Sequence, residues 1–272
     1  MMKKILTVLL LVVLAASAHA KTYKIIVGTT PGNPGDTLTR KLFDEVSKET
    51  GDTFVVVNRP GAGFMVAYKS FLDESRHTPD MILFTITSIY GTKINLEVDP
   101  SKDLKSLIAA ARVPPYVLIS KKGSQFKSFA DVRKVNIGHS SSISNFLTEK
   151  YFPPDTVYQQ VLYKTESDAI FALLKGEVEM TITSGLNAKP FEDQLNYVTT
   201  FPKEVSAVMG FCVAKTFPED EKDKLNRVIN KTLKSSELHK WTKDTLPLEL
   251  LGGSPDHYDY LVESYKKLMF SK

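Results

Sequence analysis

Residues 23–46 read YKIIVGTTPGNPGDTLTRKLFDEV, and they set the pattern of the whole chain. Residues 23–28 are an apolar run of strand length, and residues 29–36 are a turn rich in proline and glycine. Residues 37–50 then carry Leu38, Leu42, Phe43 and Val46 at helical spacing. A strand, a turn and a helix in this order are typical of α/β layers built on parallel strands.

The strand–turn–helix unit recurs in two sets. Further strands are predicted at residues 54–57, 81–86, 135–137, 157–162 and 178–182. We therefore expect an α/β protein of two lobes with two doubly wound, mostly parallel sheets. Apolar stretches at 107–120 and 205–214 follow the two sets, and each is long enough to cross from one lobe to the other. The expected division is residues 21–113 with 213–272 for the first lobe and residues 114–212 for the second.

Residues 1–20 have the composition of a secretory signal peptide. Lys3 and Lys4 precede a twelve-residue apolar run at 5–16, and Ala18-His19-Ala20 places small residues at both positions that signal peptidase reads. A membrane-spanning helix needs about 20 apolar residues, so the run is too short for an anchor. We expect cleavage after Ala20 and a periplasmic mature protein.

The composition and motifs argue against most other functions. The 272 residues include 35 Lys+Arg, 31 Asp+Glu and a single Cys, which leaves no disulfide framework, no Cys-rich metal site and no concentrated basic face for nucleic acid. None of the common hydrolase, metalloprotease, P-loop or dinucleotide motifs is present. His139-Ser140 lacks a third orienting group, so His139 is interpreted as a turn or capping residue. We expect no catalytic residues, no metal and no cofactor.

Four turns rich in hydroxyl groups and glycine follow predicted strands. They contain Thr29-Thr30 with Gly32 and Gly35, Thr87-Ser88, residues 139–142, and Thr183-Ser184. In open α/β sheets, ligands bind beyond the carboxyl ends of the strands, where helix N-termini favour anions. Taken singly, each turn is better explained as a helix cap. Four turns converging on one cleft favour a site for a small anion.

Residues 54–63, FVVVNRPGAG, resemble the V-V-V-E-N-R-P-G-A-G signature of the periplasmic solute-binding proteins of tripartite tricarboxylate transporters, the Bug family. The opening turn and helix are similar to the family's P-P-G-G-G-T-D segment. Later blocks follow in the family's order: FKSFADV at 126–132, GHSSS at 138–142, LYKTESDAIFALLKGEV at 162–178 and GGSPDHY at 252–258.

The resemblance implies a type II, Venus-flytrap binding protein that captures a small carboxylate and passes it to a membrane permease without chemistry. We expect a monomer that contacts its permease transiently. Matching the family's turns residue by residue gives these ligand-binding candidates: Thr30, Gly32, Gly35, Asp36, Ser88, Ser140, Ser141, Tyr163 and Thr183. Tyr163 is equally explained as a packing residue, and Arg59 is interpreted as a brace for its own loop.

Two departures from the family bear on specificity. Asn33-Pro34 replaces glycines in the first turn, and proline offers no amide donor. Thr183 stands where an aspartate is frequent, which favours a di- or tricarboxylate without an amine unless Glu166 or Asp168 substitutes. Two alternatives stay open: a binding protein that serves a sensor kinase, and an enzyme on the same scaffold.

Overall fold

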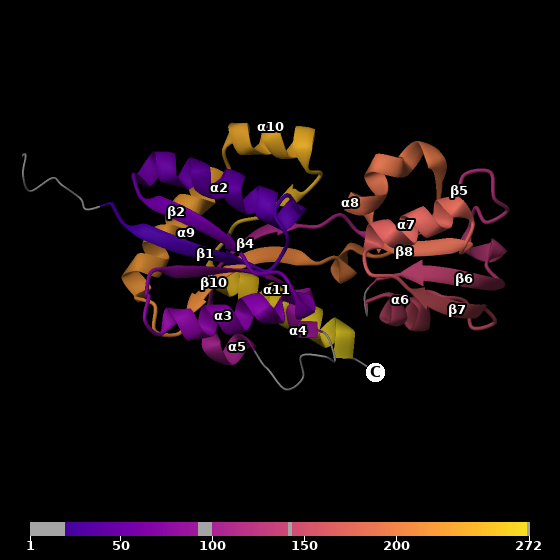
Figure 1. Cartoon of the computed structure of the whole chain (residues 1–272), viewed down its shortest axis with the longest axis horizontal. Coiled ribbons are helices and arrows are strands. Elements are labelled where there is room, and N and C mark those ends of the chain that lie inside the picture. Colours follow the sequence, from indigo (N-terminus) through magenta and orange to yellow (C-terminus); the bar gives the residue numbers. More distant parts are fainter. Residues whose placement is uncertain (1–19, 92–99, 141–142, 271–272) are drawn as a thin grey trace, which may run out of the picture.

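The computed structural model of the chain describes residues 20–91, 100–140 and 143–270. The expected signal peptide up to His19, and Ser141, lie outside these residues. The described chain forms two α/β lobes side by side, joined by two crossover segments (Figure 1). The predicted two-lobed fold is confirmed.

The first lobe is built on a sheet of strand order β11-β4-β10-β3-β1-β2. Its strands are β1 (Thr22–Val27), β2 (Thr53–Asn58), β3 (Met81–Ile86), β4 (Leu104–Arg112), β10 (Val208–Ala214) and β11 (Glu249–Leu250). Three helices cover one face, α2 (Pro34–Thr50), α9 (Glu219–Leu233) and α10 (Ser236–Thr245). The other face carries α3 (Met65–Ser75), α4 (Ser88–Gly91), α5 (Pro100–Asp103) and α11 (Pro255–Phe270) (Figure 1).

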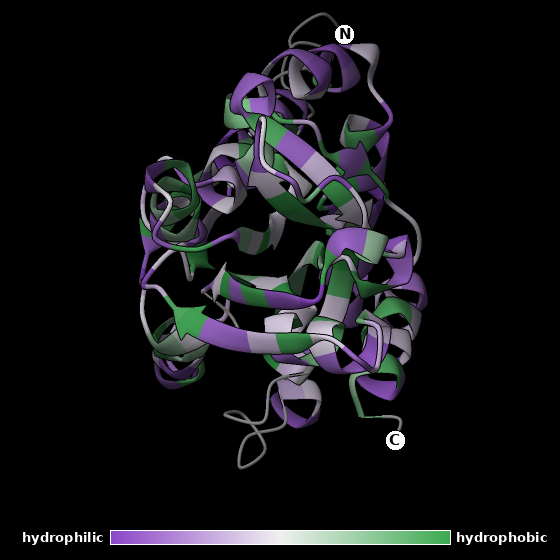
Figure 2. Ribbon diagram, turned by 90° about the vertical axis from the view of Figure 1, so that its right-hand side faces the viewer, coloured by the Kyte–Doolittle hydropathy of each residue, from purple (hydrophilic) through white to green (hydrophobic). Residues whose placement is uncertain are grey.

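The second lobe has its own five-stranded sheet, with the strand order β7-β6-β8-β5-β9. Its strands are β5 (Tyr116–Lys121), β6 (Lys134–His139), β7 (Val157–Leu162), β8 (Met180–Ser184) and β9 (Leu195–Thr200). The α-helices of this lobe are α6 (Ile143–Tyr151), α7 (Glu166–Lys175) and α8 (Gly185–Ala188). Hydrophobic and hydrophilic residues alternate along the strands and helices (Figure 2), and the buried apolar residues of this lobe form two core clusters.

The crossover strands make both sheets mixed rather than mostly parallel. β1 pairs in parallel with β2 and β3, whereas β10 pairs antiparallel with β3 and β4. In the second lobe β6 pairs in parallel with β7 and β8, whereas β5 is antiparallel to β8 and β9. A strand that returns from the other lobe runs against the strands already there, which explains the antiparallel pairings.

The return crossover also places the lobe boundary differently from the sequence analysis. The expected boundary between Cys212 and Val213 falls inside β10, whose residues from Val208 onward pair with the first sheet. The apolar run at 205–214 is continuous, so no local signal marks the point at which the chain leaves the hinge. Val113 donates its amide to Ala207 O at 2.9 Å, which joins the two crossovers side by side.

Local sequence signals explain the helix ends. Asn33 caps α2 and Pro34 opens it, while Gly51 ends it in the left-handed conformation with φ 76°. Thr165 and Asp168 form a capping box at the start of α7. Each cap places a helix N-terminus directly after a strand.

Helix α11 connects the two lobes a third time. Tyr258 and Val262 belong to a core cluster of the first lobe, whereas Leu268 and Met269 pack against a cluster of the second. The sequence analysis assigned residues 213–272, which include this helix, to the first lobe. In the described part of the chain, no helix is both long and apolar enough to cross a membrane.

Candidate functional site

The predicted turns gather in two groups, one in each lobe. β1 and β3 are parallel neighbours, so the turns after them, with Thr30 and Ser88, share one sheet edge. β6 and β8 are also parallel neighbours, which groups Ser140 with Thr183. That both groups bind one ligand stays a prediction.

Asp36 holds the first turn together. Its carboxylate is buried and accepts hydrogen bonds from Gly32 N at 2.9 Å, Arg40 Nε at 3.0 Å and Asn58 Nδ2 at 2.9 Å. Arg40 in turn donates to Asn58 Oδ1 at 2.9 Å. Asp36 therefore fixes the turn to the end of β2, and its carboxylate is already engaged within the protein.

The amides of the two turn glycines have partners inside the turn. Gly32 N is bound by Asp36, and Gly35 N donates to Asn33 Oδ1 at 3.2 Å. A Cβ atom at Gly35 would lie 2.7 Å from Phe84 Cζ, so glycine is required here for packing. Thr30, at the exposed tip, leaves its side chain accessible. The sequence analysis placed Thr29 in this turn but not among the ligand-binding candidates, and its Oγ1 is buried without a hydrogen-bond partner among the described residues.

The pKa of Asp36 lies below its ordinary value. Burial alone would raise it, but hydrogen bonds from Arg40, Gly32 and Asn58 and the charge of Arg40 outweigh burial. A lowered pKa in the folded state means that the ionised carboxylate stabilises the protein above about pH 4, its ordinary value, and that this stabilisation is lost as the pH falls through the lowered pKa.

We expect the melting temperature of the wild-type protein to exceed that of Asp36→Asn at pH 7 and the difference to shrink below about pH 4. Thermal melts followed by circular dichroism from pH 7 to pH 3 measure this difference. Curves for the two proteins that stay parallel over the whole range would contradict the pairing of the ionised carboxylate.

The loop after β2 has an unusual backbone. Gly61, Ala62, Gly63 and Phe64 all have positive φ, at 135°, 44°, 57° and 76°. Residues other than glycine rarely adopt a positive φ, because the Cβ atom clashes with the backbone. Backbone strain of this kind concentrates at functional sites. Phe64 packs over Gly28, where a Cβ would lie 2.4 Å from Phe64 Cδ1. The loop thereby braces the end of β1.

Arg59 is turned towards the protein. Its amide donates to Val27 O at 2.8 Å and its Nη2 lies 4.0 Å from Glu74 Oε1 on α3. These contacts agree with its interpretation as a brace for the loop.

The turn after β3 is attached to the crossover. Thr87 N donates to Val208 O at 2.9 Å, and Val208 N donates to Thr87 Oγ1 at 3.0 Å. Ser88 follows as the first residue of α4 and is half-buried. Movement of the crossover would therefore move Ser88.

In the second lobe, the turn after β6 carries Ser140, which is half-buried. His139 is buried at the end of the strand, and its carbonyl accepts from Tyr163 N at 2.7 Å. Tyr163 packs against a core cluster, and a Cβ at Gly138 would meet its ring at 3.2 Å. Ser144, in the first turn of α6, has a buried Oγ without a partner among the described residues.

Glu166 organises the turn after β8. Its Oε2 accepts from Thr183 Oγ1 at 2.6 Å, from Ser184 N at 2.8 Å and Oγ at 2.9 Å, and from Asn187 Nδ2 at 2.7 Å. Thr183 is fully buried. Glu166 thus joins the N-termini of α7 and α8 to the end of β8, and the Thr183 hydroxyl serves this carboxylate.

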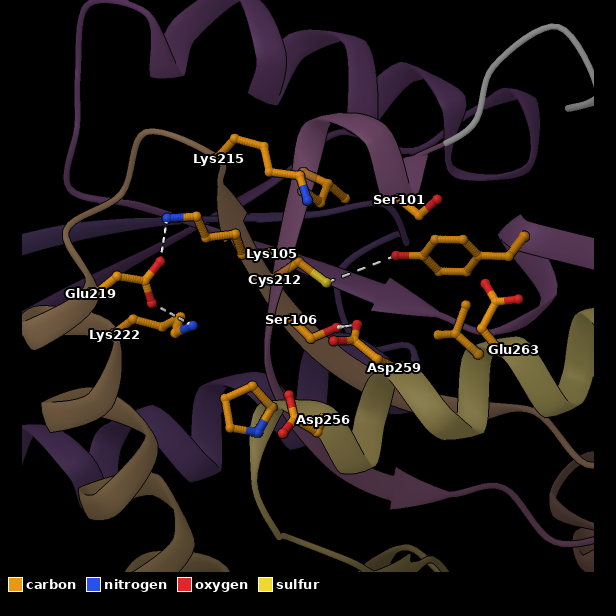
Figure 3. A pocket seen from close by; sticks show the side chains of 14 residues that line it. Ser101, Lys105, Ser106, Cys212, Lys215, Glu219, Lys222, Asp256, Asp259 and Glu263 are labelled. Atoms are coloured by element: carbon orange, nitrogen blue, oxygen red, sulfur yellow. Dashed lines mark hydrogen bonds and ion pairs between the residues drawn. The ribbon is translucent and has the colours of Figure 1, made fainter.

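A polar pocket of the first lobe lies between the start of β4, α9 and α11 (Figure 3). It measures about 460 Å³, and its charges are largely paired: Lys105 and Lys222 bind Glu219 at 2.5 and 2.6 Å, and Ser106 Oγ donates to Asp259 at 2.6 Å. Cys212 lies at its wall, and burial raises the pKa of this thiol to about 11. None of the predicted ligand-binding residues lines this pocket. Within the described residues, no group of three or more His, Cys, Asp or Glu is placed to hold a metal ion.

Comparison with known proteins was made with family models, with curated proteins and with solved structures. No family model matches the chain. The UPF0065 protein in the gbd 5′ region of Cupriavidus necator is 26% identical over 200 residues. The match covers 68% of this chain and 60% of the relative, so the chain spans less than two thirds of that relative's length.

Solved structures match over nearly the whole chain. A TctC solute-binding protein from Polaromonas has a TM-score of 0.72 at 14% identity, covering 93% of this chain and 99% of that one. The chain has the fold of the TctC-type solute-binding proteins. MatC from Rhodopseudomonas palustris, solved with malate, has a TM-score of 0.71 at 18% identity, covering 92% and 99%. A second R. palustris protein, solved with adipate, has a TM-score of 0.71 at 19% identity, covering 92% and 95%.

The TctC-type fold confirms the resemblance stated from residues 54–63, which form β2 and the loop of positive φ. One departure from the family pattern also has a structural counterpart. Thr183 stands where an aspartate is frequent, and Glu166 brings a carboxylate to within 2.6 Å of its hydroxyl. Of the two substitutes considered from the sequence, Asp168 instead accepts from Thr165 N at 3.1 Å in the capping box.

Proposed function

We propose that this protein is a periplasmic solute-binding protein that captures a small di- or tricarboxylate between its lobes and delivers it to a tripartite tricarboxylate-type membrane transporter. The observation that carries the proposal is the whole-chain match to TctC-type structures, two of which were solved with the dicarboxylates malate and adipate. The protein acts by binding and release, without chemistry.

The turns at the strand ends support a carboxylate as the ligand. The N-termini of α2, α4, α6 and α8 follow these turns, and each presents amide groups with a partial positive charge. The hydroxyls of Thr30, Ser88 and Ser140 add donors in these turns. A carboxylate held by neutral donors needs no dedicated arginine.

Glu166 supports a ligand without an amine. Its Oε2 already accepts four hydrogen bonds, so this oxygen is occupied in positioning α8. An ammonium group on the ligand would find no uncommitted acceptor on that oxygen. The favoured class is therefore a simple di- or tricarboxylate.

A thermal-shift panel tests this function. We expect malate, adipate, succinate or citrate to raise the melting temperature of the purified mature protein, with an affinity of about micromolar for the cognate ligand. Amino acids should give no shift. Stabilisation by amino acids or amines alone would refute the carboxylate proposal.

Ser140→Ala combined with Ser141→Ala separates a binding role from a capping role. We expect the affinity for the cognate carboxylate to fall while the melting temperature of the ligand-free protein stays nearly unchanged. A large loss of ligand-free stability would mean that these serines are helix caps.

A further inference from the structure

A second cavity lies where the two lobes meet, between α11 and the crossover segment that precedes β10. It measures about 580 Å³, a volume typical of small-molecule sites. Thr87, the neighbour of Ser88, lines it, but none of the predicted ligand-binding residues does. The cavity is therefore distinct in its residues from the proposed carboxylate cleft.

Arg112 lines this cavity, and its guanidinium group is only partly engaged by the protein. It ends β4, and its side chain is only 18% exposed. Nε lies 3.2 Å from Glu249 Oε2 on the edge strand β11, whereas its two Nη atoms make no hydrogen bond to a described residue. A guanidinium with free Nη donors offers the paired hydrogen bonds that a carboxylate accepts.

Ser206 supplies a second unsatisfied donor. The residue is 1% exposed and lines the cavity, and its Oγ has no hydrogen-bond partner among the described residues. A buried hydroxyl without a partner costs free energy, which a ligand acceptor at this place would recover.

The rest of the lining fixes the character of the ligand. Lys203 and Lys267 are exposed at the cavity, and Glu204 is the acid among its lining residues, so positive charge dominates. Val208, Leu261 and Tyr265 form an apolar wall. This combination suits an anion that carries an apolar body rather than a small, fully hydrated dicarboxylate.

We propose that this hinge cavity is a second binding site, for an amphiphilic monocarboxylate whose carboxylate pairs with Arg112 and Ser206 and whose apolar chain packs against Val208, Leu261 and Tyr265. The walls come from the first sheet, the crossover and α11, which are the segments that link the lobes. Occupancy of this site is independent of which carboxylate the cleft binds.

Isothermal titration of the mature protein with octanoate tests the site. We expect saturable binding of one octanoate and no binding of octanamide, which has the same chain without the charge. Arg112→Gln should weaken octanoate binding at least about tenfold, the effect of losing a charged hydrogen-bond partner. Ser206→Ala should weaken it less, and its melting temperature should not fall, because the alanine leaves no unpaired hydroxyl.

Two control variants make the result decisive. Arg133→Gln removes an exposed arginine of the second lobe, 60% exposed and 3.8 Å from Asp155, and should leave octanoate binding unchanged. Ser140→Ala alters the proposed cleft and should also leave it unchanged. The hinge site is overturned if octanoate and octanamide bind alike, if Arg112→Gln binds octanoate as wild type does, or if Ser140→Ala alone weakens binding. The last outcome would place octanoate in the cleft and leave the proposed function intact.

Discussion

Glu166→Ala is expected to lower the free energy of unfolding by about 3 kcal/mol, because it removes one acceptor that serves four donors at once. The substitution would break all four hydrogen bonds to Oε2, which come from Thr183 Oγ1, Ser184 N, Ser184 Oγ and Asn187 Nδ2. Thr183 and Ser184 are buried, so water replaces the lost acceptor poorly. Equilibrium denaturation in urea, followed by circular dichroism, measures the change.

Two further variants sharpen this measurement. Glu166→Gln keeps an amide oxygen in place of the carboxylate and should lose about 1–2 kcal/mol. Glu149→Ala removes an exposed glutamate from α6 in the same lobe and should cost less than about 0.5 kcal/mol. Equal stabilities for Glu166→Ala and Glu149→Ala would show that the four-donor arrangement does not stabilise the lobe.

Asp36→Ala is expected to weaken binding of the cognate carboxylate by about 100-fold, roughly 2.7 kcal/mol. The sequence analysis predicted Asp36 as a ligand contact, but its carboxylate holds Gly32, Arg40 and Asn58. Without it the first turn is released from the end of β2, and Thr30 loses its fixed position. Titration calorimetry with the dicarboxylate of largest thermal shift measures the affinity.

Arg40→Gln distinguishes a positioning role of Asp36 from direct contact. Arg40 is half exposed and pairs with Asp36 and Asn58, so a positioning role predicts that Arg40→Gln also weakens binding, by about tenfold. Asp44→Ala, an exposed position on the same helix, should leave the affinity unchanged. Unaltered binding in Arg40→Gln would indicate that Asp36 meets the ligand itself.

The predicted fold depended on signals that act over a few residues. The proline and glycine turn at 29–36 is such a local signal, and the structure begins α2 inside it, at Pro34. The two-lobed arrangement followed from the repetition of these units. The mixed pairing of the sheets could not be predicted in this way. A crossover strand enters its sheet from the other lobe, and the position of that lobe sets the direction of the strand.

The hydrogen-bond partners inside the candidate turns could not be predicted from the sequence. Asp36 and Asn58 lie 22 residues apart, and Glu166 and Thr183 lie 17 apart, so neither pair has a local signature. Residue type alone makes Asp36 a possible ligand contact and Thr183 a possible donor. Their actual partners are protein groups, because folding brings strand ends together that the sequence keeps apart.

The sequence by itself determined the strand–turn–helix units and the position of the hydroxyl-rich turns along the chain, since these depend on composition and on spacing within a few residues. Only the tertiary structure decided that β10 joins the first sheet, that α11 reaches both lobes, and that Arg112 and Ser206 face one cavity at the hinge. The physical reason is that hydrogen-bond partners and shared burial between distant segments exist only once the chain is packed.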